Sequence, residues 1–251
     1  AMVLGDFNGD GRNDLAYLGM PDRLIVRFQS PRGEWTKRLE YRVPDVTPSR
    51  GSLVTGDLDN NGRADLVLLG KNETSVFYQS ATGKLAPAKT LMNTSSKLGL
   101  ARVSDINGDG RADLCYSTLE GQQRSFCARF QDEQGRLGPE LRFELPPHRD
   151  IHLGNMDAQR GRELLVVETQ TNRVKLMRFQ AAGKVEAAQP KQRLIQYGFG
   201  RQGADRTEQL RDVATGDVDG DGRIDVVVSD PVAAQTIVFR QRAKGGLDLG
   251  Q

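Results

Sequence analysis

Residues 105–114 read DINGDGRADL. Three aspartates and an asparagine lie within the first nine positions, just before an apolar run begins. The same pattern returns as DFNGDGRND at 6–14, DLDNNGRAD at 57–65 and DVDGDGRID at 217–225, and a decayed copy, NMDAQRGRE, lies at 155–163. The copies recur at intervals of roughly 50 residues, a period that is typical of repeat architectures.

The repeat extends well beyond the acidic stretch. Each copy runs into a short apolar segment, such as LAYLG or LVLLG, and a second strand-like run ending near glutamine follows, such as LIVRFQ or SFCARFQ. A glycine comes next in every copy: Gly33, Gly83, Gly135, Gly183 and Gly245. A further extended segment then leads to the strand that carries the next acidic stretch. Each unit therefore indicates four short strands separated by turns, with little helical periodicity.

These units predict an all-β fold, a β-propeller built from four-stranded antiparallel blades, with five repeats. The blades are expected at about 1–50, 51–97, 98–149, 150–209 and 210–251, within a single domain of 1–251. A β-sandwich is the alternative, although a sandwich has no reason to repeat its loops at a constant interval. We favour a closed five-bladed ring because the copies nearly fill the chain. A slice of a six- or seven-bladed propeller, with two open sheet edges, is the other possibility.

Composition excludes several classes of protein. No run of eighteen apolar residues is present, so membrane insertion is not expected. The formal net charge is only +2 and the basic residues are scattered, which argues against a dedicated nucleic-acid binder. No leader peptide opens the chain, but the start, AMVLGDFN, looks clipped and says little about location.

The acidic stretches have the chemistry of a calcium loop. Carboxylates crowded beside an apolar run repel one another, and a divalent cation removes that cost. Oxygen-bearing side chains at positions 1, 3 and 5, glycine at position 6 and aspartate at position 9 suit Ca²⁺. The loop is not an EF-hand, because position 12 lies in a strand-like run and is Tyr17, Leu68, Tyr116 or Val228 instead of glutamate. The alternative is an acidic turn that is merely solvated.

The unit GDxNGDGRxDLxxxG resembles the FG-GAP/VCBS repeat of integrin-α-type β-propellers, and the resemblance runs through all five units. It implies one structural Ca²⁺ in the loop between the first two strands of a blade, bound by the side chains at positions 1, 3, 5 and 9 and the carbonyl at position 7. Four regular copies imply about four ions, with these ligands: Asp6, Asn8, Asp10, Arg12 and Asp14; Asp57, Asp59, Asn61, Arg63 and Asp65; Asp105, Asn107, Asp109, Arg111 and Asp113; Asp217, Asp219, Asp221, Arg223 and Asp225.

The copy at 155–163 departs from this pattern. Asn155, Asp157, Gln159 and Glu163 keep oxygen atoms, but Arg160 replaces the turn glycine. A positive side chain and a costly positive-φ backbone both count against a metal. We expect no ion in this loop, with Arg160 as a candidate for the cation's place.

The four arginines at position 7 allow two interpretations. Four bound Ca²⁺ would raise the formal net charge from +2 to about +10, so these arginines could form a ring that attracts acidic glycans or proteins. Alternatively, they contribute carbonyls while their side chains dilute the local acidity, which is the interpretation we favour.

Cysteine and histidine offer little further chemistry. Cys115 and Cys127 are equidistant from Gly121, so a hairpin centred there would pair them and favour a disulfide over two buried thiols. His148 and His152, four residues apart on an extended segment, are expected on one face but lack a third ligand for zinc. No nucleophile elbow, phosphate loop or paired cysteine motif is present, so no catalytic residue is assigned.

One segment lies outside the repeat. Residues 194–212, LIQYGFGRQGADRTEQLRD, lengthen the fourth interval, and Tyr197, Phe199, Arg201 and Arg206 could form a partner surface. A passive insertion, or a piece that seals the ring, is the alternative.

The hypothesis for function is a non-enzymatic binding or scaffolding propeller that recognises a protein or a carbohydrate through its loops. Its calcium sites suit the millimolar calcium outside cells, so a secreted, periplasmic or cell-surface location is expected, within a larger surface protein. The alternative is the propeller module of a polysaccharide-degrading enzyme such as a lyase, because similar calcium-bearing propellers occur there. A structural spacer is the third possibility.

Overall fold

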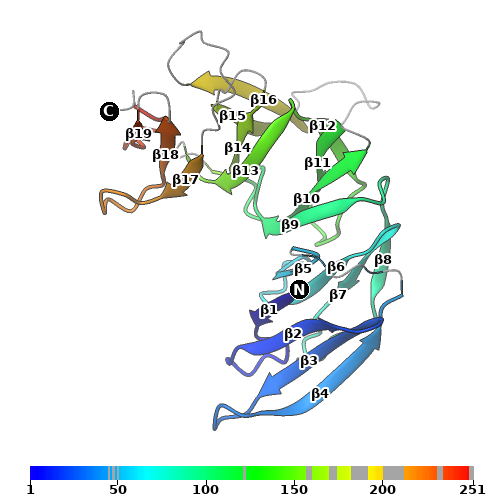
Figure 1. The fold of residues 1–251 in the computed structure, drawn as a ribbon. Coiled ribbons are helices and arrows are strands. Elements are labelled where there is room, and N and C mark those ends of the chain that lie inside the picture. Colours follow the sequence, from blue (N-terminus) through cyan, green and yellow to red (C-terminus); the bar gives the residue numbers. More distant parts are fainter. Residues whose placement is uncertain are drawn as a thin grey trace. The chain divides into compact units, whose positions relative to one another are not determined.

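The structure, a computed structural model, describes residues 1–44, 46, 49, 51–120, 123–156, 160–169, 174–181, 192–199, 212–230 and 234–248. Its strands form five antiparallel sheets, and in each sheet consecutive strands are hydrogen-bonded neighbours (Figure 1). Within these described ranges all elements of regular secondary structure are β-strands. The prediction of an all-β chain made of small repeated sheets is therefore confirmed.

Each sheet is one blade. Blade 1 contains β1 (Met2–Gly5), β2 (Asp14–Gly19), β3 (Arg23–Gln29) and β4 (Trp35–Arg42), and blade 2 contains β5 (Leu53–Gly56), β6 (Asp65–Leu69), β7 (Glu73–Phe77) and β8 (Lys89–Met92). Blade 3 contains β9 (Leu98–Ser104), β10 (Asp113–Glu120), β11 (Gln123–Arg129) and β12 (Leu141–Glu144). Blade 4 contains β13 (His148–Gly154), β14 (Glu163–Glu168), β15 (Val174–Ala181) and β16 (Gln192–Phe199). Blade 5 contains β17 (Val213–Gly216), β18 (Asp225–Asp230) and β19 (Gln235–Phe239).

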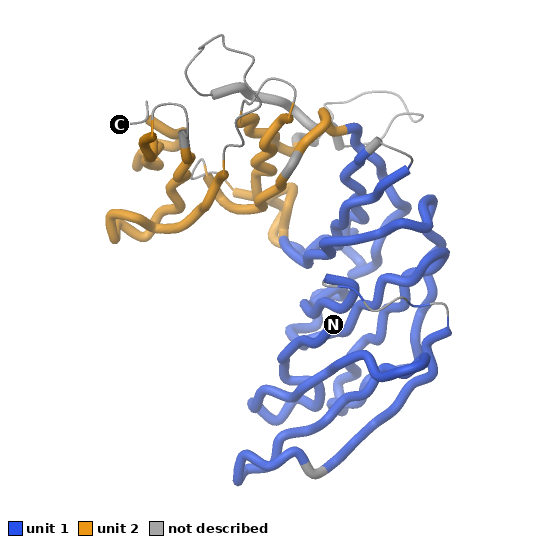
Figure 2. Tube along the Cα trace, viewed as in Figure 1, with its two compact units in different colours: residues 1–104, 111–144 blue, residues 105–110, 145–251 orange. Residues whose placement is uncertain are grey.

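The chain divides into two compact units (Figure 2). Unit 1 comprises residues 1–104 and 111–144, and unit 2 comprises residues 105–110 and 145–251. The acidic loop of blade 3 thus groups with blade 4, and not with its own blade. Closure of the five blades into one ring and the single domain 1–251 stay predictions.

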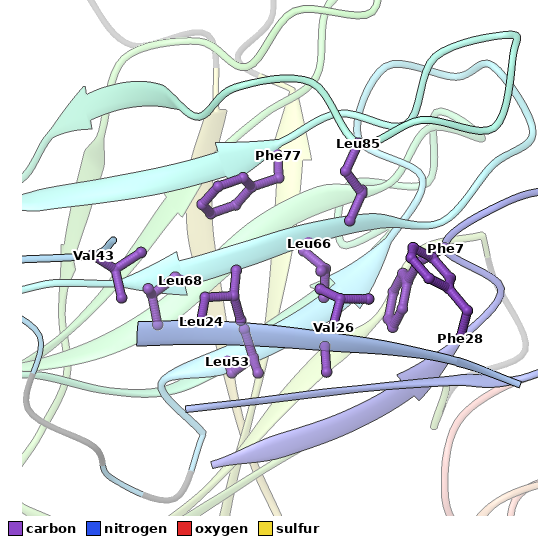
Figure 3. Packing of buried hydrophobic residues seen from close by; sticks show 11 residues of the cluster. Phe7, Leu24, Val26, Phe28, Val43, Leu53, Leu66, Leu68, Phe77 and Leu85 are labelled. Carbon is purple, nitrogen blue, oxygen red and sulfur yellow. The ribbon is translucent and has the colours of Figure 1, made fainter. Parts of the chain in front are cut away.

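Blade 2 shows why these strands are so apolar. In β6 every residue is buried, and the strand has two packed faces. Leu66 and Leu68 belong to the cluster shared with blade 1, drawn in Figure 3, whereas Val67 and Leu69 belong to the cluster shared with blade 3. Because successive strand residues point to opposite faces, a sheet covered on both sides needs a continuous apolar run. In unit 1 the blades therefore stack face to face.

The predicted disulfide is wrong. In the β10–β11 hairpin Cys115 pairs with Ala128 and Tyr116 pairs with Cys127, so the hairpin is centred between residues 121 and 122. This shift of one register position puts the two sulfur atoms on opposite faces of the sheet. Both cysteines are buried free thiols, and burial raises the pKa of each to about 12.

The expectation that His148 and His152 share a face is also wrong. A β-bulge between His148 and Asp150 sets His148 opposite Glu168 and His152 opposite Leu165, so the strict alternation of faces is lost. His148 Nδ1 lies 2.8 Å from the carbonyl oxygen of Pro146, and His152 Nε2 lies 3.1 Å from Asp150 Oδ2. The two imidazoles therefore make separate local contacts.

The sequence predicts extra loop length at 194–212, but residues 192–199 form β16, the fourth strand of blade 4. Tyr197 and Phe199 lie in this strand, opposite Leu176 and Val174. Other residues singled out in the sequence lie outside the described residues, namely Asp157, Gln159, Gly183, Arg201 and Arg206. Among the residues that are described, no helix has the length and apolar character needed to cross a membrane.

Candidate calcium loops and their docking between blades

Each of the four regular acidic loops wraps its backbone around the carboxylate at position 1. In blade 1, Asp6 Oδ1 accepts hydrogen bonds from the backbone N–H groups of Gly9 (2.6 Å) and Asp10 (3.1 Å), and Oδ2 accepts one from Gly11 (2.7 Å). Burial alone would raise the pKa of Asp6, but these N–H donors outweigh it and lower the pKa. The same N–H bond to Oδ2 recurs for Asp57 (2.8 Å), Asp105 (2.9 Å) and Asp217 (2.9 Å).

Two left-handed residues give the loops this shape. The predicted turn glycines at position 6 have φ between 79° and 87°, which confirms their role: Gly11, Gly62, Gly110 and Gly222. Position 4 is also left-handed, with glycine in three copies and Asn60, at φ 59°, in the other. Position 4 was not predicted, although its glycine or asparagine, the residues that tolerate this conformation best, was a signal for it.

The aspartate at position 9 is the first residue of the second strand, and its side chain holds the loop and the blade together. Asp14 is fully buried; its Oδ2 accepts the N–H of Phe7 (2.9 Å) and its Oδ1 accepts the N–H of Gln29 (2.9 Å) at the end of β3. Asp65 and Asp225 make the same pair of bonds in blades 2 and 5, at 2.8 to 2.9 Å.

In two loops the carboxylates converge as a cation site requires. Oxygen atoms of Asp57, Asp59 and Asp65 lie within 4.8 Å of one another, and Asp217, Asp219 and Asp225 form the equivalent group. Asp59 Oδ1 is buried without a hydrogen-bond partner. Burial, helped by the neighbouring charges of Asp59 and Asp57, raises the pKa of Asp65 to about 7 despite its two backbone N–H donors, which lower the pKa. An oxygen-only donor set with unbalanced negative charge fits Ca²⁺.

The other predicted ligands are less converged. Asn61 turns its amide towards Asp59 and the Gln79 carbonyl, while its Oδ1 accepts the N–H of Arg63 (2.8 Å). Asn8 Oδ1 and Asn107 Oδ1 accept the backbone N–H of the residue at position 5. In blade 3, residues 105–110 belong to unit 2 and Asp113, fully buried, belongs to unit 1. The complete ligand sets stay predictions.

The arginines at position 7 are held by the blade instead of forming a free cationic ring. The Nε groups of Arg12, Arg111 and Arg223 donate, at 3.0 to 3.2 Å, to the carbonyl of the glutamine at the end of the third strand or two residues beyond it. Arg63 reaches the Ala81 carbonyl (3.3 Å). Arg12 and Arg223 also pair with the aspartate at position 5 of their own loops. These contacts agree with the interpretation that the side chains balance local acidity.

The first four loops also insert into the next blade. The apolar residue at position 2 is at most 1% exposed in the first four copies, namely Phe7, Leu58, Ile106 and Met156. Phe7 packs in one cluster with Leu66, Phe77 and Leu85 of blade 2 (Figure 3), and Met156 packs with Val226 and Phe239 of blade 5. We call this residue the plug.

A glutamine from the next blade fastens the loop. Gln79 Nε2 donates to the carbonyl of Asp6 (2.8 Å), Gln131 Nε2 to that of Asp57 (3.3 Å), and Gln241 Nε2 to that of Asn155 (3.3 Å). These three glutamines are buried. The acidic loops therefore lie at blade boundaries, where a cation would brace two blades at once.

The glycine of the β7–β8 hairpin and its counterpart in blade 3 allow the close approach. A Cβ on Gly83 would lie 1.9 Å from the carbonyl oxygen of Asn8, and a Cβ on Gly135 would lie 2.2 Å from that of Asp59. The repeated glycine noted in the sequence thus serves packing between blades as well as the turn itself.

Comparison with known protein families agrees with this geometry. The FG-GAP-like repeat family matches residues 6–68 and 57–116, which contain the first three acidic loops. Residues 6–116 therefore carry FG-GAP-like repeats. One similar solved structure is the crystal structure of BBS1N in complex with ARL6DN, soaked with mercury, at 12% identity and a TM-score of 0.46. The similarity covers 99% of this chain and 64% of that one, so this chain spans less than two thirds of its length. No curated protein matches the sequence.

The decayed acidic loop of blade 4 keeps a buried carboxylate at position 9, but a glutamate replaces the aspartate. Glu163 takes the place of the aspartate at position 9; it is fully buried and Oε2 accepts the N–H of Met156 (2.6 Å). Burial raises the pKa of Glu163 to about 7. Arg178 Nε lies 3.6 Å from Glu163 Oε1. The role expected of Arg160 stays a prediction.

Blades 1 and 2 of the FG-GAP array also enclose a cleft of about 550 Å³. Tyr41, Val43 and Phe77 contribute apolar surface to it, and the rings of Tyr41 and Phe77 lie 4.8 Å apart. Of its charged lining residues, Arg42 pairs with Asp22 and Glu40 with Arg23. This mixed surface suits the binding of a partner and does not specify a reaction.

Proposed function

We propose that the chain is a non-enzymatic binding scaffold whose FG-GAP blades are braced by about four structural Ca²⁺ ions. The observation that carries this proposal is the position of the acidic loops, because the converging carboxylates of Asp57, Asp59 and Asp65 lie where the loop of blade 2 contacts blade 3. Bound Ca²⁺ would offset the repulsion between these carboxylates and leave the loop and both blades in one arrangement.

The expected stabilisation follows from mass action. A ligand that binds only the folded state stabilises it by RT ln(1 + [Ca²⁺]/Kd), about 2.7 kcal/mol per site at a hundredfold excess over Kd. Loops of weak affinity would be filled at millimolar calcium and empty at cytosolic levels. We therefore infer that the scaffold works outside the cytoplasm: secreted, periplasmic or at a cell surface.

The partner is a protein or a glycan. Rigid blades with loops at their ends are a common platform for recognition, and the cleft between blades 1 and 2 adds a concave surface. A glycan array combined with a lyase assay on acidic polysaccharides tests the binding role. Binding without new unsaturated chain ends is expected, whereas turnover would overturn the proposal in favour of a lyase module.

Thermal unfolding tests the calcium role. The melting temperature is expected to rise on addition of millimolar Ca²⁺ and to fall with EDTA, with Mg²⁺ giving a smaller effect because it prefers a rigid octahedral site. The double variant Asp57→Asn, Asp59→Asn should lose part of the calcium-dependent rise while it keeps the melting temperature in EDTA. A melting temperature that is indifferent to chelation would contradict the calcium role.

A further inference from the structure

The cleft between blades 1 and 2 lies at the outer strands of the two blades, and both blades belong to unit 1. One wall is blade 1, with Tyr41 near the end of β4 and Val43 just after it. The other wall is blade 2, where Ser75 and Phe77 of β7 share a face, and Ser75 pairs with Thr90 of β8. The cleft is therefore an opening at the edge of an interface that is otherwise packed with apolar residues.

Blade 3 shows what this place holds when the interface is closed. Its third and fourth strands correspond residue for residue with those of blade 2, since Cys127 pairs with Arg142 as Ser75 pairs with Thr90. By the same correspondence Glu140 of blade 3 stands where blade 2 has Ala88. The boundary between blades 2 and 3 is thus an internal reference for the cleft.

A network of charged side chains fills the boundary between blades 2 and 3. Glu140 accepts a hydrogen bond from Thr94, just after β8 of blade 2, and lies 3.6 Å from Arg129. Arg142 also donates to Thr94 (2.9 Å), and Arg129 donates to the carbonyl of Met92. The side chains of Arg129 and Glu140 are nearly buried, so this boundary is closed to solvent at the place where the other one is open.

Blade 2 does not build this network with blade 1. At the positions of the three charged residues it has Phe77, Ala88 and Thr90, and blade 1 has Pro44 where blade 2 has Thr94. Proline brings neither a hydroxyl nor an N–H group, and alanine brings no carboxylate. Smaller or uncharged side chains therefore leave the open volume of about 550 Å³.

The chemistry of this open space suits an uncharged ligand rich in hydroxyl groups. Asn72, Ser75 and Thr90 line it with short neutral side chains, for which the described residues supply no side-chain hydrogen bond. Each of these side chains can donate and accept, as sugar hydroxyls do. Tyr41 and Pro87, both at least partly exposed, add an apolar surface for the C–H groups of a sugar ring.

Charge argues against an ionic ligand. The described lining residues include two basic and two acidic side chains, so their formal charges cancel. Of these, Glu40 and Arg42 already have ion-pair partners in blade 1. Lys71 and Glu73 carry opposite charges at the β6–β7 turn. A phosphate-bearing or strongly acidic ligand therefore finds no excess of positive charge in the cleft.

We propose that the cleft between blades 1 and 2 binds an uncharged oligosaccharide. A sugar ring packs on Tyr41 and Pro87, and its hydroxyl groups bond to Asn72, Ser75 and Thr90. The volume is within the range of sites that hold small ligands. This inference rests on the proposed binding role, for which it names the site and the class of ligand, and it does not depend on calcium.

Isothermal titration calorimetry with defined tetrasaccharides tests the site. The probes are the neutral tetrasaccharides of glucose, xylose, mannose and galactose, and the tetrasaccharide of galacturonic acid is the acidic comparison. At least one neutral probe should bind, and more tightly than the acidic one. Ala88→Glu places in the cleft the side chain that blade 3 has at this position, and it should weaken binding at least tenfold. Ala243→Glu, in an exposed turn of blade 5, is the matched control and should bind like the unmodified chain.

A second variant tests the hydrogen bonds without an added charge. Ser75→Ala combined with Thr90→Val removes two hydroxyl groups and keeps the shape of both strands. Binding of the neutral probe should weaken about tenfold, with the melting temperature unchanged. If no neutral tetrasaccharide binds, or if both this variant and Ala88→Glu bind it like the unmodified chain, the proposal is overturned.

The same titrations separate this proposal from the proposed function. Binding of the acidic tetrasaccharide alone would overturn the cleft assignment and leave the scaffold role intact. Release of unsaturated chain ends would overturn the scaffold role itself.

Discussion

The hairpin glycine after the third strand lies directly beneath the loop of the preceding blade. Gly83 has φ of 71°, and the space where its Cβ would be is filled by the backbone of Asn8. Gly33, at the same place in blade 1, has φ of 80° and open space around it. Substitutions at the two glycines therefore separate the free-energy cost of the left-handed backbone from the cost of a collision with the neighbouring loop.

We expect Gly83→Ala to destabilise the chain by at least ~3 kcal/mol, because the left-handed backbone costs 1 to 2 kcal/mol and the collision with Asn8 adds to it. Gly33→Ala should cost only ~1 to 2 kcal/mol, the backbone share alone. Denaturant unfolding at low protein concentration measures both. Equal losses would mean that Gly83 is not a contact between blades.

Asp14 and Asp10 belong to one acidic loop but contribute differently to stability. Asp14 is buried and accepts two backbone N–H groups, whereas Asp10 is exposed and is held by Arg12. Asp14→Ala should therefore destabilise the chain by ~2 kcal/mol or more even in EDTA, since two buried donors lose their acceptor. Asp10→Ala should cost less than ~0.5 kcal/mol in EDTA. In Ca²⁺ it should show reduced stabilisation, and unfolding free energies in the two buffers check this. Similar losses for both variants in EDTA would be the contrary result.

Among the strands, blade 3 is joined to the end of blade 2 by a polar network. Glu140, just before β12, accepts hydrogen bonds from Thr94 and from Tyr116 of β10, and Arg129 of β11 lies 3.6 Å away. The side chains of Arg129 and Glu140 are 5% and 3% exposed. Burial alone would raise the pKa of Glu140, but the bonds from Thr94 and Tyr116 outweigh it and lower the pKa.

This shift predicts a pH dependence. A carboxyl group whose pKa is lowered by folding stabilises the fold above its unfolded pKa, and that contribution is lost as pH falls through the folded value. We expect Glu140→Gln to be less stable than the unmodified chain at pH 7. The difference in unfolding free energy should shrink as the pH falls below 4.5, the ordinary pKa of a glutamate side chain. Urea unfolding of both proteins from pH 7 to pH 3 in EDTA measures it. A difference that stays constant with pH would show that Glu140 does not act through its charge.

Strand positions could be predicted from the repeat, but register and docking could not. Five apolar runs before a glutamine located the third strands, because a blade buried on both faces needs such runs. Cys115 and Cys127 show the limit, because a shift of one register position puts their side chains on opposite faces, and the spacing around Gly121 did not reveal that shift. The β-bulge between His148 and Asp150 changes the alternation of faces in the same way, so the prediction that His148 and His152 share a face failed.

The candidate site was predictable at the level of single loops and no further. Oxygen-bearing positions and the turn glycine follow from local chemistry, and the structure brings Asp217, Asp219 and Asp225 together as expected. The insertion of Phe7 into blade 2 and the bond from Gln79 to Asp6 join residues about 70 positions apart. Such contacts depend on how blades stack, which no single copy of the repeat encodes.

For the molecule as a whole, the loops matter because each one belongs to two blades. Residues 105–110 even group with unit 2, while the rest of blade 3 lies in unit 1 (Figure 2). A cation in such a loop would act on the stability of an array and not of a single turn. Loss of calcium should therefore loosen several blades together, as expected for repeats coupled through their interfaces.

The most direct test of calcium binding by the acidic loops is the number of Ca²⁺ ions bound per chain, measured by native mass spectrometry of the folded protein. The account predicts about four ions, one for each regular loop, and the loss of one ion in a variant that carries both Asp217→Asn and Asp219→Asn. Fewer than two ions per chain, or a count that is unchanged in that variant, would contradict it.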